Sequence, residues 1–174
     1  VAGNTRRFGA SLEKIKKVIE PRSGEIMFGR NMIVSKGKTV FVGDTSVHEY
    51  PSSEELAEIA ISTARVVRLF GFDPKVAFVS HSTFGQPLTS RTKHIKNAVN
   101  ILKEKDVDFE FDGDMQPDVA LNEQYKELYP FSNIVGNANI LIMPGQHSAA
   151  ISYKMMRELG GAKVIGPLLI GLAQ

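Results

Sequence analysis

The segment Lys75 to Gly85 constrains the fold more than any other part of the sequence. It begins with Val76 to Val79, a short apolar run rich in residues that favour β-strands, and continues directly into the polar loop Ser80 to Gly85. A helix is predicted to start near Thr89. Such a unit is typical of a buried strand in an α/β sheet, and ligands bind in the crevice beyond the carboxyl ends of such strands. The loop is therefore a candidate binding site.

The side chains of this loop allow two interpretations. Ser80, Ser82 and Thr83 carry hydroxyl groups that can contact a ligand, and Gly85 lets a ligand come close to the backbone. Serine, threonine and glycine are also ordinary turn residues, so the same loop can serve only to connect the strand to the helix. Spacing alone does not separate the two interpretations.

Helices and strands alternate along most of the chain. Alternation with short connections predicts a three-layer α/β/α fold with a mostly parallel sheet, and an early hairpin predicts that one edge of the sheet is antiparallel. The helix after Ser52 has the clearest signal, because Ser52 and Glu55 form a capping box. The predicted elements are a hairpin over 25–35 and 39–43, helices over 52–70, 90–105 and 147–159, and strands over 107–111 and 139–143.

The C-terminal part carries two apolar patterns. Ala150, Ile151, Met155 and Leu159 recur at helical spacing and are predicted to form the buried stripe of their helix. The run 168–172 has the composition of a buried strand, and a natural C-terminus seldom stops inside one. Because the first residue is also a valine rather than a methionine, we expect the chain to be part of a longer protein, which mass spectrometry of the source protein would show.

Composition argues against several classes of protein. A chain of 174 residues predicts one domain with one sizeable core. A net charge of +2 provides no general field for nucleic acid or a membrane surface, and no apolar run approaches the ~20 residues of a membrane span. There is no cysteine for a disulfide, a thiolate nucleophile or a zinc site. No signal peptide is visible, so the cytoplasm is the expected location.

Two basic residues near the start form a second candidate site. Arg6 and Arg7 precede a helix predicted over 12–19 and capped by Ser11, and two arginines before a helix N-terminus can hold a phosphate group. The alternative is a solvated basic loop. His48 stands alone in the loop 44–51 and is predicted to be a surface residue rather than a ligand.

Three carboxylates, Asp112, Asp114 and Asp118, fall close together after a predicted strand. They can bind a metal ion or act in proton transfer. They can equally cap the helix predicted to begin near Pro117, because a helix N-terminus stabilises acidic side chains. The EF-hand spacing is absent, which argues against calcium. A metal site at these three residues is the weaker alternative.

Six segments stand in one colinear order that covers nearly the whole chain. They are Glu55–Ser62, Val79–Gly85, Phe111–Asp118, Asn137–Pro144, Ile151–Lys154 and Ile165–Leu172. Taken together, they resemble the phosphate acetyl/butyryltransferase family.

The resemblance implies an isocitrate/isopropylmalate dehydrogenase-like α/β/α fold in two subdomains, with coenzyme A and acyl phosphate bound in the cleft between them. Residues 23–174 would form the second subdomain, and residues 1–22 the helix that approaches it from the first. The family's Ser-Arg-Gly region, with its essential arginine, would follow Gln174. The chain by itself is therefore predicted not to catalyse acetyl transfer. The expected cleft residues are Ser80, Ser82, Thr83 and Gly85, with Arg6 and Arg7 as phosphate contacts.

The chain departs from the family pattern at three positions. Phe84 stands where active phosphotransacetylases usually have a lysine, Glu13 where the first helix usually has an arginine, and Ala150 where an asparagine is usual. A cleft that handles phosphate needs fixed positive charge to stabilise developing anionic charge. The first two changes remove such charge and make turnover unfavourable.

The Ser-Thr-Phe-Gly form of 82–85, and Asp118 after Asp-Gly-Asp-Met-Gln, most resemble the C-terminal domain of multidomain bacterial malic enzymes. That resemblance implies a regulatory domain that senses acetyl-CoA and helps to assemble a homo-oligomer, with no catalytic residue or cofactor of its own. NADP and a divalent metal would act on a separate malic-enzyme domain in cis. The alternative is a fragment of a catalytic phosphate acetyltransferase, which interconverts acetyl-CoA and acetyl phosphate.

Overall fold

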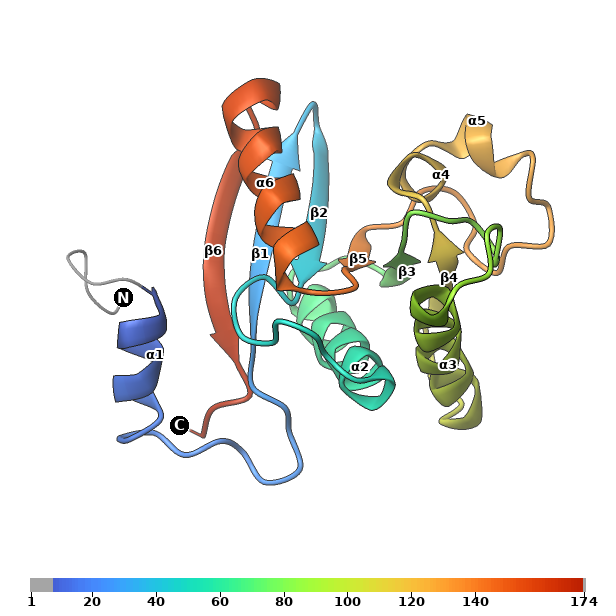
Figure 1. The fold of residues 1–174 in the computed structure, drawn as a ribbon. Helices are drawn as coiled ribbons and strands as arrows, with labels where there is room; N and C mark the ends of the chain where they lie inside the picture. Colours follow the sequence, from blue (N-terminus) through green and yellow to red (C-terminus); the bar gives the residue numbers. More distant parts are fainter. Residues whose placement is uncertain (1–7, 174) are drawn as a thin grey trace.

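A computed structural model describes residues 8–173, and its central element is a six-stranded sheet (Figure 1). The strands β2, β5, β3 and β4 are parallel neighbours, whereas β1 is antiparallel to both β2 and β6. The predicted mostly parallel sheet is confirmed, and its one reversed strand lies one place in from the edge. In spatial order the strands are β4 (Glu110–Met115), β3 (Lys75–Val79), β5 (Ile140–Ile142), β2 (Lys38–Gly43), β1 (Phe28–Ser35) and β6 (Lys163–Ile170).

The predicted hairpin is the β1–β2 pair. Ser35 is opposite Lys38, so only Lys36 and Gly37 form the turn. Both turn residues have positive φ, 50° and 75°. Glycine adopts such a conformation without steric cost, and two-residue turns of this kind match the twist of the two strands.

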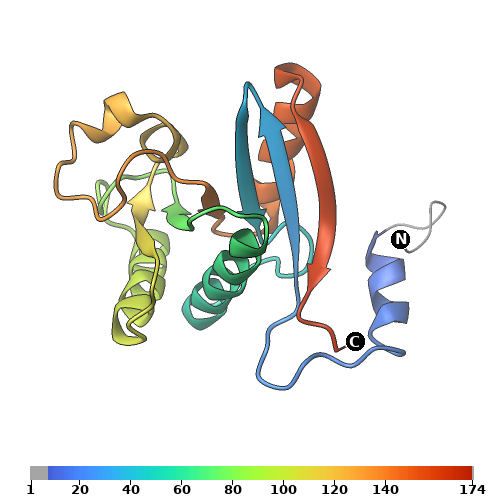
Figure 2. The ribbon, with the colours of Figure 1, turned by 180° about the vertical axis from the view of Figure 1, so that it is seen from behind.

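Helices cover both faces of the sheet. On one face, α2 (Ser53–Leu69) and α3 (Ser90–Glu104) pack against buried side chains such as Phe41 and Phe78. On the other face, α4 (Pro117–Leu121) and α6 (Gln146–Gly160) contribute to a second cluster with residues such as Leu141. Two cores on opposite faces confirm the three-layer architecture. The remaining helices are α5 (Glu123–Lys126), after α4, and α1 (Phe8–Ile15), beside β6 (Figures 1 and 2).

Within residues 8–173, no helix has both the length and the apolar character needed to cross a bilayer.

The strand order reverses between β3 and β5. The chain runs from β3 through α3 to β4, and then crosses back to β5 on the other side of β3. The helix after β3 packs on one face of the sheet, and the helix after β5 packs on the other. The connections therefore diverge at the carboxyl ends of these two strands, where open α/β sheets form their ligand-binding crevice.

Two predictions for the C-terminal part are wrong. Of the described α6 residues, Ala149 alone is buried, whereas Ile151, Met155 and Leu159 are 58%, 55% and 83% exposed. The helix rests on the sheet through a different side, which includes Ala149 and Tyr153. The apolar run at the end of the chain is also not a buried strand. It contributes to β6, which lies at the sheet edge and is mostly exposed.

Two predicted boundaries also shift. The first helix, α1, spans Phe8–Ile15 rather than 12–19, so Ser11 lies inside it instead of capping it. Val18, beyond its end, is 83% exposed. The strand β4 extends to Met115, so Asp112 and Asp114 lie within the strand instead of in the loop after it.

Candidate functional site

The Ser80–Gly85 loop is tied to the end of β4 by Asp114. One carboxylate oxygen of Asp114 accepts a hydrogen bond from the Ser82 hydroxyl, and the other accepts one from the backbone N–H of Gly85 at 3.0 Å. The backbone N–H of Phe84 donates to the Asp114 carbonyl at 2.6 Å. Because Asp114 is buried, this carboxylate fixes the shape of the loop from inside the protein.

The hydroxyl groups predicted to line a cleft are turned into the protein. Ser80, Ser82 and Thr83 are all buried. The Thr83 hydroxyl accepts a hydrogen bond at 3.2 Å from the backbone N–H of Gln116, the residue that precedes α4. The structure thus brings the predicted loop residues together and leaves Gly85 partly open, while the serine and threonine side chains hold the loop in place. Ligand contacts by these residues stay a prediction.

Phe84 forms an aromatic cluster with two residues of the segment after α5. Its ring centroid lies 4.8 Å from that of Phe131 and 5.5 Å from that of Tyr129, with inclined ring planes. Phe131 is 64% exposed, so the cluster opens to solvent at the carboxyl end of β3. The chain therefore presents three aromatic rings in contact at the candidate loop.

The three carboxylates of the metal alternative take separate partners. Asp112 accepts hydrogen bonds from the backbone N–H groups of Gly113 at 2.9 Å and Asn133 at 2.7 Å. Asp114 holds the candidate loop, and Asp118 caps the first turn of its own helix. Among residues 8–173, no group of three or more His, Asp or Glu side chains is placed to hold a metal ion. Capping and turn formation account for these acids in the structure.

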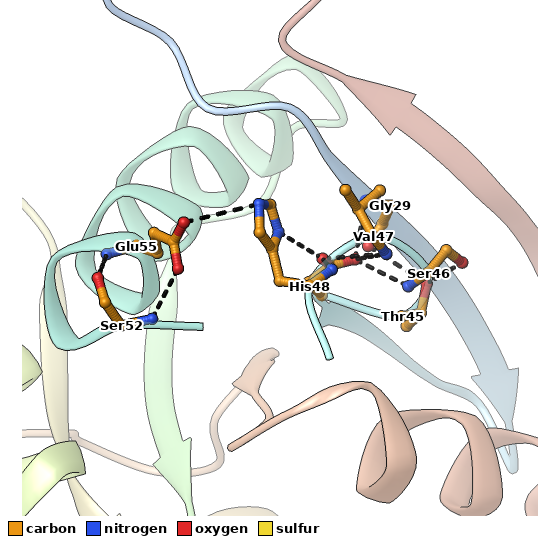
Figure 3. Close-up of polar contacts among 8 residues, drawn as sticks. Gly29, Thr45, Ser46, Val47, His48, Ser52 and Glu55 are labelled. Carbon is orange, nitrogen blue, oxygen red and sulfur yellow. Dashed lines mark hydrogen bonds and ion pairs between the residues drawn. The ribbon is translucent and has the colours of Figure 1, made fainter. Parts of the chain in front are cut away.

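Asp44, just beyond β2, organises another loop at this edge of the sheet. Ser46, Val47 and His48 of this loop are labelled in Figure 3. Its carboxylate accepts hydrogen bonds from the backbone N–H groups of Gly29, Ser46 and His48 at 2.7–2.9 Å, and from the His48 ring at 2.8 Å. The other ring nitrogen of His48 is 3.9 Å from the Glu55 carboxylate at the start of α2. His48 is thus a link within the structure rather than the surface residue that was predicted. The only signal for this loop arrangement in the sequence is an Asp directly after a strand, followed by small polar residues.

A groove of about 350 Å³ opens between this loop, the start of α3 and the segment after β5, and is lined in part by Tyr50, Arg91, His94 and Pro144. Tyr50 is exposed, with the Arg91 guanidinium carbon 5.8 Å from its ring centroid and the His147 ring stacked at 6.3 Å. The groove lies beside the point where the strand order reverses. No sequence motif marks it, because its residues come from separate segments.

The first turns of the two helices beside this groove differ in charge. In α2, the pKa of the exposed Glu54 carboxyl lies below its usual value because the backbone N–H of Glu54 and the Ser52 hydroxyl donate hydrogen bonds to it. In α3, the first turn has no acidic residue and contains Arg91. Negative charge is favourable at a helix N-terminus, so charge stabilises the N-terminus of α2 more than that of α3.

The remaining predicted positions lie away from the loop. Arg6 and Arg7 are outside the described residues. Glu13 is exposed on α1, with its carboxylate 3.9 Å from the Lys16 ammonium. Ala150 is partly buried in the first turns of α6.

A three-layer domain with its candidate site at the carboxyl edge of a mostly parallel sheet belongs to the class of open α/β domains. A family model described as phosphate acetyl/butaryl transferase matches residues 1–174, and the chain belongs to this family.

Three similar proteins place the chain within the family. The NADP-dependent malic enzyme of Rhizobium meliloti (strain 1021) is 48% identical over 172 residues, which cover 99% of this chain and 23% of that protein. The phosphate acetyltransferase of Clostridium acetobutylicum is 41% identical over 133 residues, 75% of this chain and 40% of that protein. The crystal structure of a phosphotransacetylase from Streptococcus pyogenes matches with a TM-score of 0.89 and 28% identity, covering 99% of this chain and 54% of that one. The chain thus spans about a quarter of the malic enzyme and about half of the phosphotransacetylase.

Proposed function

We propose that this chain is the acetyl-CoA-sensing and oligomerising domain of an NADP-dependent malic enzyme, without acetyl-transfer activity of its own. The 48% identity to the Rhizobium meliloti enzyme over nearly the whole chain supports such a parent. In that parent, a separate malic-enzyme domain in cis would carry out the oxidative decarboxylation of malate with NADP and a divalent metal. We expect a cytoplasmic homo-oligomer with no nucleic-acid or membrane partner.

The aromatic cluster around Phe84 is the observation that carries this proposal. Aromatic rings bind a heterocycle or an acyl chain by stacking and apolar contact, so the cluster suits acetyl-CoA as a ligand. The lysine of the family pattern would stabilise the charge that develops on a reacting phosphate, and phenylalanine cannot. Binding without turnover is the combination that a sensor needs.

Calorimetric titration of the chain with acetyl-CoA tests the binding. We expect Phe131→Ala to weaken binding about 10-fold, since one stacked ring contributes about 1–3 kcal/mol. Phe72→Ala is the matched control, because Phe72 is also partly exposed but lies before β3, at the opposite end of the sheet. A wild-type chain that binds no acetyl-CoA, or two variants that lose affinity equally, would contradict the proposal.

The regulatory part is tested on the full-length protein that carries this chain. Acetyl-CoA should inhibit malate oxidation, and unchanged malate oxidation at saturating acetyl-CoA would count against a sensor.

The 41% identity to the Clostridium acetobutylicum enzyme favours a second candidate, a catalytic phosphate acetyltransferase. Formation of acetyl-CoA from acetyl phosphate and CoA by the full-length protein would select it.

A further inference from the structure

We propose that a cavity between α4 and α6 binds a small uncharged aliphatic molecule of about four carbon atoms. The cavity lies on the face of the sheet opposite to α2 and α3. It shares no lining residue with the Ser80–Gly85 loop, the aromatic cluster around Phe84 or the groove beside Tyr50. The inference is therefore independent of acetyl-CoA binding and goes beyond the proposed function.

The cavity exists because the two helices on this face cover the sheet incompletely. Ala149 is the one buried side chain among the described residues of α6, and α4 is only five residues long. Figure 1 shows the two helices standing apart. They leave a space of about 100 Å³ between them, over β1, β2 and β5.

The floor of the cavity is apolar and shielded from solvent. Five side chains of the sheet and its β5 end form it, and each is at most 9% exposed. A water molecule needs two to four polar partners to remain in a buried site, and these side chains offer none. The floor therefore favours an apolar occupant over water. The five residues are Ile33, Val40, Val42, Leu141 and Met143.

The walls formed by the two helices provide an entrance. Pro117 of α4 and Ser152 and Met156 of α6 line the cavity and also reach solvent. The Met156 side chain is unbranched and flexible, so it can move aside without a change in the backbone. None of the described residues that line the cavity is charged. A charged ligand would thus lose its hydration without gaining a partner, which selects an uncharged one.

The volume of the cavity sets the size of the ligand. An engineered apolar cavity of about 150 Å³ holds benzene, which has six carbon atoms. At the same packing density, about 100 Å³ holds about four. The ligand gains van der Waals contacts with the buried side chains of the floor. Because so few carbon atoms bury little apolar surface, we expect a dissociation constant of about 1 mM.

Methyl NMR of the full-length protein that carries this chain tests the site, with n-butane as the probe. We expect chemical-shift changes at the methyl groups of Val40, Val42 and Leu141, and none at Ile59, which lies in α2 on the opposite face. n-Butylammonium, which adds a charge to the same carbon chain, should cause no change. Unchanged lining methyl groups under butane, or equal changes in both cores, would overturn the proposal.

Filling the cavity provides the matched variants. Val40→Ile combined with Val42→Ile adds two methyl groups to the floor and should weaken butane binding about 10-fold or more. Val18→Ile makes the same chemical change at an 83% exposed position and should leave binding unaltered. Ser152→Leu fills the space from the exposed side of α6, so it replaces the double variant if circular dichroism shows that the latter does not fold. A folded filling variant with wild-type affinity for butane contradicts the site.

Discussion

At the scale of single residues, Arg30 is a polar group that the fold does not satisfy. It is 1% exposed in β1, and within residues 8–173 its Nε and Nη1 atoms have no hydrogen-bond partner. Burial lowers the pKa of its guanidinium, whose central carbon lies 5.4 Å from the Phe41 ring centroid. Burying a charge without a partner is unfavourable, and the cation–π contact offsets only part of that cost.

We therefore expect Arg30→Met to stabilise the protein, by about 1–3 kcal/mol, because methionine fills similar space without a polar group. Chemical denaturation measures the change. Arg65→Met is the matched control, since Arg65 is exposed, pairs with Glu25 at 3.0 Å, and should change stability by no more than about 0.5 kcal/mol. A loss of stability in the Arg30 variant would mean that its guanidinium has a partner in solution.

At the scale of elements, the capping box of α2 fixes where that helix begins. The Ser52 hydroxyl accepts a hydrogen bond from the backbone N–H of Glu55 at 3.1 Å, and the Glu55 carboxylate accepts one from the backbone N–H of Ser52 at 2.7 Å. We expect Ser52→Ala to cost about 1 kcal/mol in thermal or chemical denaturation, the usual value for a lost N-cap. Ser90→Ala, at the exposed first position of α3, should cost less. Equal losses would show that the box does not contribute.

Elements with local signals could be predicted, and elements decided by tertiary packing could not. The α2 capping box is recognisable in the sequence as Ser-x-x-Glu. The start of α3 has an equivalent box, but Thr92 takes the place of the Glu, so the sequence pattern does not reveal it. In α6, the most regular apolar stripe faces outward, because Ala149 and Tyr153 make the contact with the sheet. Periodicity reports which residues share a side of a helix and does not report which side meets the core.

The candidate site was predictable in position and not in detail. The loop after β3 was found because a buried strand followed by small polar residues is a local pattern. Its closure by Asp114 depends on the neighbouring strand β4, and the pairing of Phe84 with Phe131 depends on the segment after α5. Both partners are distant from the loop in the sequence. Contacts of this kind leave no mark on spacing, so the sequence did not show that the Ser82 and Thr83 hydroxyl groups also hold the loop in place.

At the scale of the whole molecule, the two cores make the centre of the sheet its most stable part. Every residue of β5 is buried, and the strand lies between β3 and β2 with apolar clusters on both faces. The outer side differs, since β6 pairs with β1 alone among the strands of residues 8–173, and α6 buries little of its surface. Opening of the outer side therefore exposes less apolar surface than opening of the centre.

Native-state hydrogen exchange should follow this gradient. We expect amides of β3 and β5 to exchange slowest, through global unfolding, and those in the last turns of α6 to exchange orders of magnitude faster. Protection in α6 equal to that in β3 would show that the helix belongs to the central cooperative unit, and would contradict the gradient.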